Sequence, residues 1–155
     1  MTMKSARSAI IACCLLASMT AATAQPITCA LAEAPVLALR TDLMVAALGC
    51  GQRSDYNAVV RRHRTTLARA EREMIAAFDQ AAVSRDYDTW ITTLANERSL
   101  ALAADRVTFC ARTRAVFREA KAAPANAAAL QALSTRRSVG YPPLEAACTA
   151  KPPVS

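Results

Sequence analysis

Cysteine and histidine are the side chains of this 155-residue chain that are best suited to nucleophilic, redox or metal chemistry. The chain has six cysteines and a single histidine, His63. One histidine with widely spaced cysteines does not match the ligand spacing of a zinc site, and no C-x-x-C-H motif for haem attachment is present. No glycine-rich nucleotide loop follows a predicted strand. We therefore expect no metal and no cofactor, and we expect cysteines to form disulfides.

Two of the six cysteines lie in an N-terminal segment with the layout of a secretory signal peptide. Lys4 and Arg7 give a positive start, an apolar run extends over about residues 9–19, and Ala22-Thr23-Ala24 precedes Gln25. We predict a signal peptide over residues 1–24 and a periplasmic or secreted protein, in a compartment where disulfides persist. The cysteines that remain after cleavage are Cys29, Cys50, Cys110 and Cys148.

Two other interpretations of the N-terminus compete with cleavage after Ala24. The apolar run is shorter than the roughly 20 residues that span a bilayer, which disfavours an uncleaved anchor. The stretch Ile10-Ile11-Ala12-Cys13 resembles a lipobox, so lipidation of Cys13 is the stronger rival. Apolar residues continue past Cys13 into Leu15 and Leu16, where a lipoprotein turns polar, and this favours removal of the segment.

The composition of the remaining chain is typical of helices. Removal of 24 residues from 155 leaves 131, the size of one domain that can bury about two thirds of its unfolded surface. The chain is rich in alanine, the best helix former, and has only three glycines. We predict an all-α, antiparallel bundle of three to four helices over residues 25–138, stapled by two disulfides. An extended proline-rich tail over residues 139–155 follows, tied back by Cys148.

Apolar residues at helical spacing define the helices of this bundle. The first is expected over residues 30–48 and is ended by Gly49 and Gly51. The second is expected from residue 54 or 55 to about residue 82, and the third from residue 86 to about residue 122. A short fourth helix is expected over residues 124–134.

Helix geometry favours one of the three ways in which four cysteines can pair. A first helix without a sharp break at Pro35 would hold Cys29 and Cys50 on the order of 30 Å apart, whereas bonded cysteines have Cα atoms within about 7 Å. If the second and third helices form an antiparallel hairpin about Ser84-Arg85, Cys110 lies close to Cys50. We therefore predict two disulfides, Cys50–Cys110 and Cys29–Cys148.

The same hairpin brings together polar residues that lie on the apolar helix faces. It sets His63 level with Asp105 and Glu71 level with Arg98, which gives two candidate buried polar pairs. Buried charges need such partners, because an unpaired charge in the core is costly. His63 oriented by a carboxylate could begin an acid–base or nucleophilic site, but no G-x-S-x-G motif supplies a nucleophile. We favour a core pair that fixes the register of the helices.

Arginines cluster on the opposite face of the second helix. The chain has a net charge of +7, and loss of Lys4 and Arg7 reduces it to +5. In an exported protein such a face suits an anionic partner such as lipid headgroups or acidic glycans. No aromatic residues are interleaved with the arginines, so we expect no nucleic acid. A solvated face without a partner is the alternative interpretation. The candidate arginines are Arg61, Arg62, Arg69 and Arg72.

Several short motifs, each occurring once, lie along the first three predicted helices. They are Cys50 with Tyr56-Asn57 and Val60, then Tyr87-Asp88-x-Trp90 with Thr93-Leu94-Ala95-Asn96, and finally Phe109-Cys110. This pattern resembles a group of small exported α-helical bacterial proteins with no assigned function. The resemblance implies export, a helical hairpin and a Cys50–Cys110 disulfide, and it implies no activity.

Together these features predict a non-enzymatic exported interaction module that binds an envelope protein or an anionic surface through its arginines. One alternative is a carrier of a small apolar ligand, which needs a cavity between the helices. Another is an enzyme centred on His63, which needs the imidazole exposed in a cleft. We expect no transmembrane span in the mature chain. The carrier cavity would be lined by Tyr87, Trp90, Leu94 and Met74.

Overall fold

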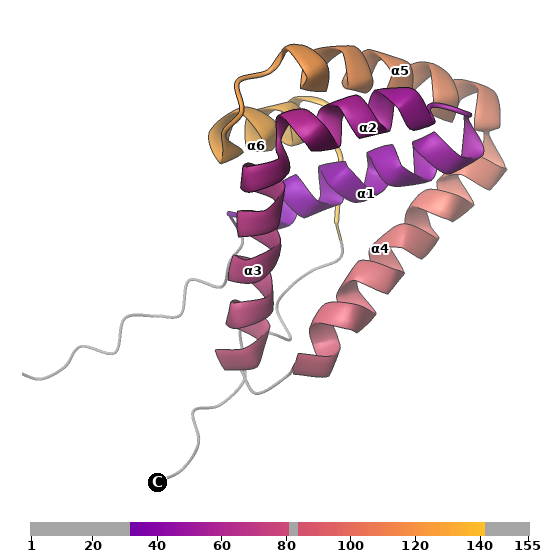
Figure 1. Ribbon diagram of the computed structural model, residues 1–155. Helices are drawn as coiled ribbons and strands as arrows, with labels where there is room; N and C mark the ends of the chain where they lie inside the picture. The colour runs from indigo at the N-terminus through magenta and orange to yellow at the C-terminus, as the bar shows by residue number, and fades with distance from the viewer. Residues whose placement is uncertain (1–31, 81–83, 142–155) are drawn as a thin grey trace, which may run out of the picture.

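The computed structural model describes residues 32–80 and 84–141, which form six α-helices and no strand (Figure 1). The predicted all-α class is confirmed for this part of the chain. The expected three to four helices are corrected to six, because the second and third predicted helices are each interrupted once. The helices are α1 (Ala34–Gly49), α2 (Arg53–Arg62), α3 (Arg64–Gln80), α4 (Ser84–Ala104), α5 (Arg106–Ala122) and α6 (Ala127–Arg136).

The central element of the fold is α1, and every other helix packs against it. Eleven of its 16 residues are buried, and they lie on all sides of the helix. An amphipathic surface helix buries one apolar stripe, whereas a helix that is buried all round lies in a core. Pro35 stands in the first turn of α1, where a missing N–H breaks no helical hydrogen bond.

The second predicted helix turns sharply at His63, which separates α2 from α3 (Figure 1). The backbone of His63 leaves the helical region, with φ −104° and ψ 16°. Two side chains bracket this corner: Arg62 Nε donates to Ala123 O at 2.9 Å, and Thr66 Oγ1 donates to Ala125 O at 3.2 Å. The corner therefore lets α2 lie along α5 while α3 leaves in another direction.

The third predicted helix is interrupted at Asp105, which separates α4 from α5. Asp105 is the N-cap of α5, and its carboxylate accepts a hydrogen bond from the Thr108 backbone N–H at 3.0 Å. A capping carboxylate satisfies an N–H group that lacks a helical partner. The predicted hairpin is thus reduced to α3 and α4. These two helices project from the layer of α1, α2 and α5 and diverge from each other where they join it (Figure 1).

The two ends of the described chain lie next to each other. After α6, Val139 is buried and Tyr141 packs edge-to-face on Trp90, with ring centroids 6.5 Å apart. At the other end, the Ala32 carbonyl accepts a hydrogen bond from Gln131 Nε2 of α6. Pro35 lines the same surface depression as Val139 and Tyr141. Residues 32–35 and 139–141 therefore lie in one region of the helical body.

Candidate functional site

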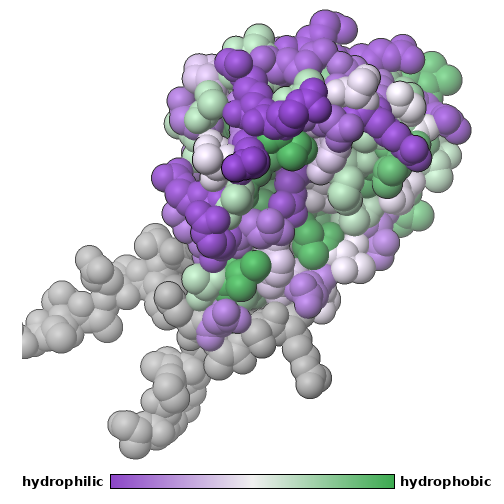
Figure 2. Space-filling model, viewed as in Figure 1, coloured by the Kyte–Doolittle hydropathy of each residue, from purple (hydrophilic) through white to green (hydrophobic). Residues whose placement is uncertain are grey.

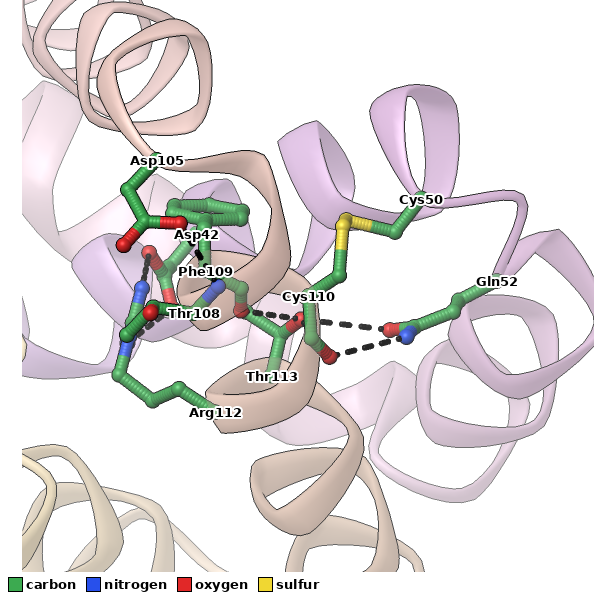
Figure 3. Close-up of a disulfide and its surroundings, with 9 residues drawn as sticks. All are labelled: Asp42, Cys50, Gln52, Asp105, Thr108, Phe109, Cys110, Arg112 and Thr113. Carbon is green, nitrogen blue, oxygen red and sulfur yellow. Dashed lines mark hydrogen bonds and ion pairs between the residues drawn. A yellow bond between two sulfur atoms is a disulfide. The ribbon is translucent and has the colours of Figure 1, made fainter.

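The predicted Cys50–Cys110 disulfide is present and joins the C-terminal end of α1 to the first turns of α5 (Figure 3). The two Cα atoms are 5.6 Å apart, and 60 residues separate the cysteines in the sequence. Gln52 packs behind the bond, with its Nε2 3.4 Å from the Cys110 carbonyl. Thr113 Oγ1 donates to Phe109 O at 3.0 Å. The bond therefore holds the α1–α2 turn against α5.

Asp42 forms an ion pair in the core that the sequence analysis missed. Its side chain is fully buried in α1, and both carboxylate oxygens accept a hydrogen bond from Arg112, each at 3.0 Å (Figure 3). Arg98 of α4 approaches the same carboxylate, with its Nε 3.7 Å from Oδ1. The Arg112 guanidinium also lies over the Phe109 ring at 4.9 Å. One carboxylate thus ties α1 to α4 and α5.

Glu71 pairs with Arg40 of α1, and the expected Glu71–Arg98 pair was wrong. The pair is bidentate, with oxygen–nitrogen distances of 3.1 and 3.2 Å, and the Tyr87 hydroxyl donates to Glu71 at 3.4 Å. Arg98 instead faces Asp42 and donates to the Gly140 carbonyl. The pairing differs because α3 and α4 diverge from each other, so residues at corresponding positions along the two helices do not face each other (Figure 1).

His63 is fully buried, and its expected pairing with Asp105 was also wrong. Its Nε2 lies 2.8 Å from the Ala120 carbonyl of α5, while Nδ1 is buried with no hydrogen-bond partner. Asp105 is exposed at the start of α5, where it caps that helix. The helix breaks at His63 and Asp105 themselves explain the difference, because the expected pairing assumed an antiparallel hairpin of two straight helices. Within the described residues, His63 is a core residue at the α2–α3 corner.

A pH-dependent contribution to stability is expected from Glu71. The hydrogen bond from Arg40 lowers the pKa of Glu71 below its ordinary value of 4.5, although burial opposes this effect. A lowered folded-state pKa stabilises the fold above the ordinary pKa and loses this contribution as pH falls through the folded value. Denaturant midpoints measured between neutral pH and about pH 3 should therefore fall more for the wild type than for Glu71→Gln.

Glu33 offers the opposite control for this pH experiment. Burial, followed by the hydrogen bond and charge of Glu73, raises the pKa of Glu33. Protonated Glu33 therefore stabilises the fold at low pH. This contribution is lost as pH rises through the raised pKa of Glu33, because the ionised form opposes folding. Glu33→Gln should gain stability relative to the wild type at neutral pH. Equal pH profiles for the wild type, Glu71→Gln and Glu33→Gln would contradict both assignments.

The four predicted arginines are all exposed, but the corner at His63 divides them between two helices. Arg61 and Arg62 end α2, whereas Arg69 and Arg72 lie on α3. Arg62 is held by the Ala123 carbonyl, and Arg69 Nε lies 3.6 Å from Glu73. Figure 2 shows that hydrophilic residues predominate over this side of the molecule. We call these four residues the arginine surface.

A small, mostly apolar cavity lies between α1, α2, α3 and α6. Its volume is about 10 Å³, at the lower limit for one water molecule. The side chains expected to line a ligand cavity are all buried, and Tyr87 packs on Phe78 and Trp90 with ring centroids 5.8 and 6.5 Å apart. The four are Tyr87, Trp90, Leu94 and Met74.

The described residues contain neither a cluster of metal-binding side chains nor a helix suited to cross a membrane. Nowhere in residues 32–80 and 84–141 do three or more histidine, cysteine, aspartate or glutamate side chains gather as a metal site would require. None of the helices in these residues has the length and apolar character needed to cross a bilayer.

Comparison with known proteins identifies no relative: no protein-family model, curated protein or solved structure matches this chain.

Proposed function

We propose that this protein is a non-enzymatic, periplasmic or secreted interaction module that binds an envelope protein or an anionic surface through the arginine surface. The observation that carries the proposal is the surplus of exposed cations on α2 and α3. Among the described residues, Arg61 and Arg72 have no carboxylate partner, and Arg64 beside the corner has none either. Exposed cations without internal partners are available to an external anion.

The complete burial of His63 favours an interaction role over catalysis at this residue. A general base must lie within hydrogen-bond reach of a substrate proton. The imidazole is fully buried, and its Nε2 is engaged by the Ala120 carbonyl. An enzyme centred on His63 therefore has no support. The cavity between α1, α2, α3 and α6 does not support a ligand carrier, because it is far smaller than the roughly 300 Å³ or more of a small-molecule pocket.

Binding of anionic vesicles tests the arginine surface. Oxidised mature protein should sediment with phosphatidylcholine vesicles that contain phosphatidylglycerol, and this binding should weaken in high salt because exposed charges are screened. Arg61→Gln with Arg72→Gln should weaken binding, whereas Arg118→Gln, an exposed change on α5, should leave it nearly unchanged. Capture of envelope proteins on immobilised protein is the parallel assay. Capture or sedimentation that ignores both salt and the two substitutions would refute the proposal.

We also propose that Cys29–Cys148 forms the second disulfide, which fits export to an oxidising compartment. Both cysteines lie outside the described residues. Support comes from the neighbouring chain ends: Cys29 stands three residues before Ala32, and Cys148 seven residues after Tyr141. Seven residues can span at most about 25 Å, so the chain between the two ends is long enough to close the bond.

Peptide mapping of unreduced protein tests this second bond and the export signal together. Mature protein recovered from the periplasm or medium should begin at Gln25, and its only cysteine-linked peptides should join Cys29 to Cys148 and Cys50 to Cys110. A lipidated N-terminal Cys13, or free thiols at Cys29 and Cys148, would refute the corresponding part. The resemblance to small exported bacterial proteins is part of the same proposal. A chain that stays in the cytoplasm and keeps its first 24 residues would refute both.

A further inference from the structure

We propose that an open hollow beside the Cys50–Cys110 disulfide binds an acidic, extended segment of a partner protein. The hollow has a volume of about 330 Å³ and is separate from the arginine surface on α2 and α3. We call it the disulfide hollow. Its lining residues are Cys50, Arg106, Val107, Cys110 and Arg114.

The spacing of Arg106 and Arg114 along α5 determines which ligand both side chains can bind at once. Arg106, Cys110 and Arg114 follow each other at intervals of four residues, so they lie along one side of the helix. The eight residues from Arg106 to Arg114 correspond to about 12 Å along the helix axis. In an extended peptide, two residues four positions apart are about 13 Å apart and point to the same side. The hollow therefore matches two acidic residues at positions i and i+4.

Both guanidinium groups are free to take a carboxylate. Among the described residues no carboxylate pairs with Arg106 or Arg114, and both side chains are exposed. The neighbouring Asp105 is engaged at the N-cap of α5 by Thr108, whereas Arg112 is engaged by Asp42 on another side of the helix (Figure 3). Arginine binds carboxylates through paired hydrogen bonds, which gives such contacts geometric specificity.

An apolar side chain at position i+2 would sit between the two arginines, over the disulfide. Val107, which lines the hollow, is 82 % exposed. Leu48 near the end of α1 and Leu100 near the end of α4 are 64 % and 70 % exposed, close to where these helices end beside α5. In Figure 2, hydrophobic residues reach the surface among hydrophilic ones on the right-hand side, where Figure 1 shows α4 meeting α5. Exposed apolar groups rimmed by charge are typical of protein interaction sites.

A protein segment fits this place better than a lipid surface does. Interfacial membrane binding uses apolar side chains that project into the bilayer. Here the two cysteines of the disulfide line a hollow, which can take a single side chain but not a bilayer. Acid–apolar–acid alternation at i, i+2 and i+4 is therefore the expected recognition pattern.

Fluorescence anisotropy with a labelled peptide tests the proposal. The probe is Ser-Glu-Ser-Leu-Ser-Glu-Ser, and its matched control carries glutamine in place of both glutamates. Oxidised protein should bind the probe at least about tenfold more tightly than the control. Arg106→Gln with Arg114→Gln should remove this preference, whereas Arg118→Gln on the same helix should retain it. The replaced side chains are exposed, and circular dichroism melting confirms that the variants fold.

The outcomes separate this inference from the proposed function. Equal affinity for both peptides, no binding of the probe, or full binding by the Arg106→Gln/Arg114→Gln variant would each overturn the inference. Anionic vesicles that bind through Arg106 and Arg114 while the peptide does not would also overturn it and assign the hollow to lipid. The Arg61→Gln/Arg72→Gln variant should keep the peptide preference while its vesicle binding weakens, so either proposal can fail alone.

Discussion

Loss of the Cys50–Cys110 disulfide is expected to lower the free energy of unfolding by about 4 kcal/mol. The bond closes a loop across a sequence separation of 60 residues, and that loop contains all of α2, α3 and α4. In the chain-entropy account, a crosslink of this length removes many conformations from the unfolded chain, so its loss favours unfolding. Guanidinium unfolding of the Cys50→Ser/Cys110→Ser variant should show a lower midpoint.

A second background isolates the effect of this one bond. The double serine variant should be made both in the wild type and with Cys29→Ser and Cys148→Ser already in place. A similar loss in both backgrounds assigns the effect to Cys50–Cys110, because independent sites contribute additively. A loss below about 1 kcal/mol in both backgrounds would contradict the prediction and indicate that the unfolded chain keeps this loop compact without the bond.

The sequence was sufficient to predict helices and one crosslink, because these depend on local composition and on approximate lengths. Alanine-rich apolar periodicity identifies helices wherever they lie. The Cys50–Cys110 pairing was also predictable, although the straight hairpin used to derive it is broken at two places. It remained correct because α2 packs against α5 beyond both corners, so the two cysteines still meet at one end.

The corners and the polar pairs could not be predicted from helical periodicity. Apolar spacing continues through His63 and Asp105, so the sequence carries no interruption where the chain turns. An aspartate that caps a helix has the same side chain as one within a helix, and only the surrounding backbone separates the two cases. The breaks at His63 and Asp105 gave these two residues other partners, and the divergence of α3 and α4 separated Glu71 from Arg98, which is why both expected pairs were wrong.

Asp42 did carry a signal that could have been used. It lies among apolar residues in α1, and a carboxylate in such a helix requires a cationic partner. Choosing Arg112, 70 residues away, required the three-dimensional packing of α1 against α5. The arginine surface was predictable only in part. Its residues lie on the polar face of the predicted second helix, so their exposure could be predicted, whereas their division between α2 and α3 could not.

Replacement of Arg112 by methionine is expected to lower the free energy of unfolding by about 3 kcal/mol. The Asp42 carboxylate is fully buried and would keep only Arg98, whose Nε is 3.7 Å away and makes no hydrogen bond. A buried charge that loses its partner retains its full desolvation cost. The contact of the guanidinium with the Phe109 ring would be lost as well.

The decisive observation is the partial recovery of stability when the carboxylate is also removed. In the Asp42→Asn/Arg112→Met double variant, no unpaired carboxylate remains, so the double variant should be more stable than the sum of the two single losses predicts. Arg118→Met is an exposed change on the same helix, at a residue that pairs with no carboxylate in the described part of the chain, and it should change stability by no more than about 0.5 kcal/mol. Additive losses at Asp42 and Arg112 would mean that the two side chains contribute independently. In that case the buried ion pair would not be what ties α1 to α5.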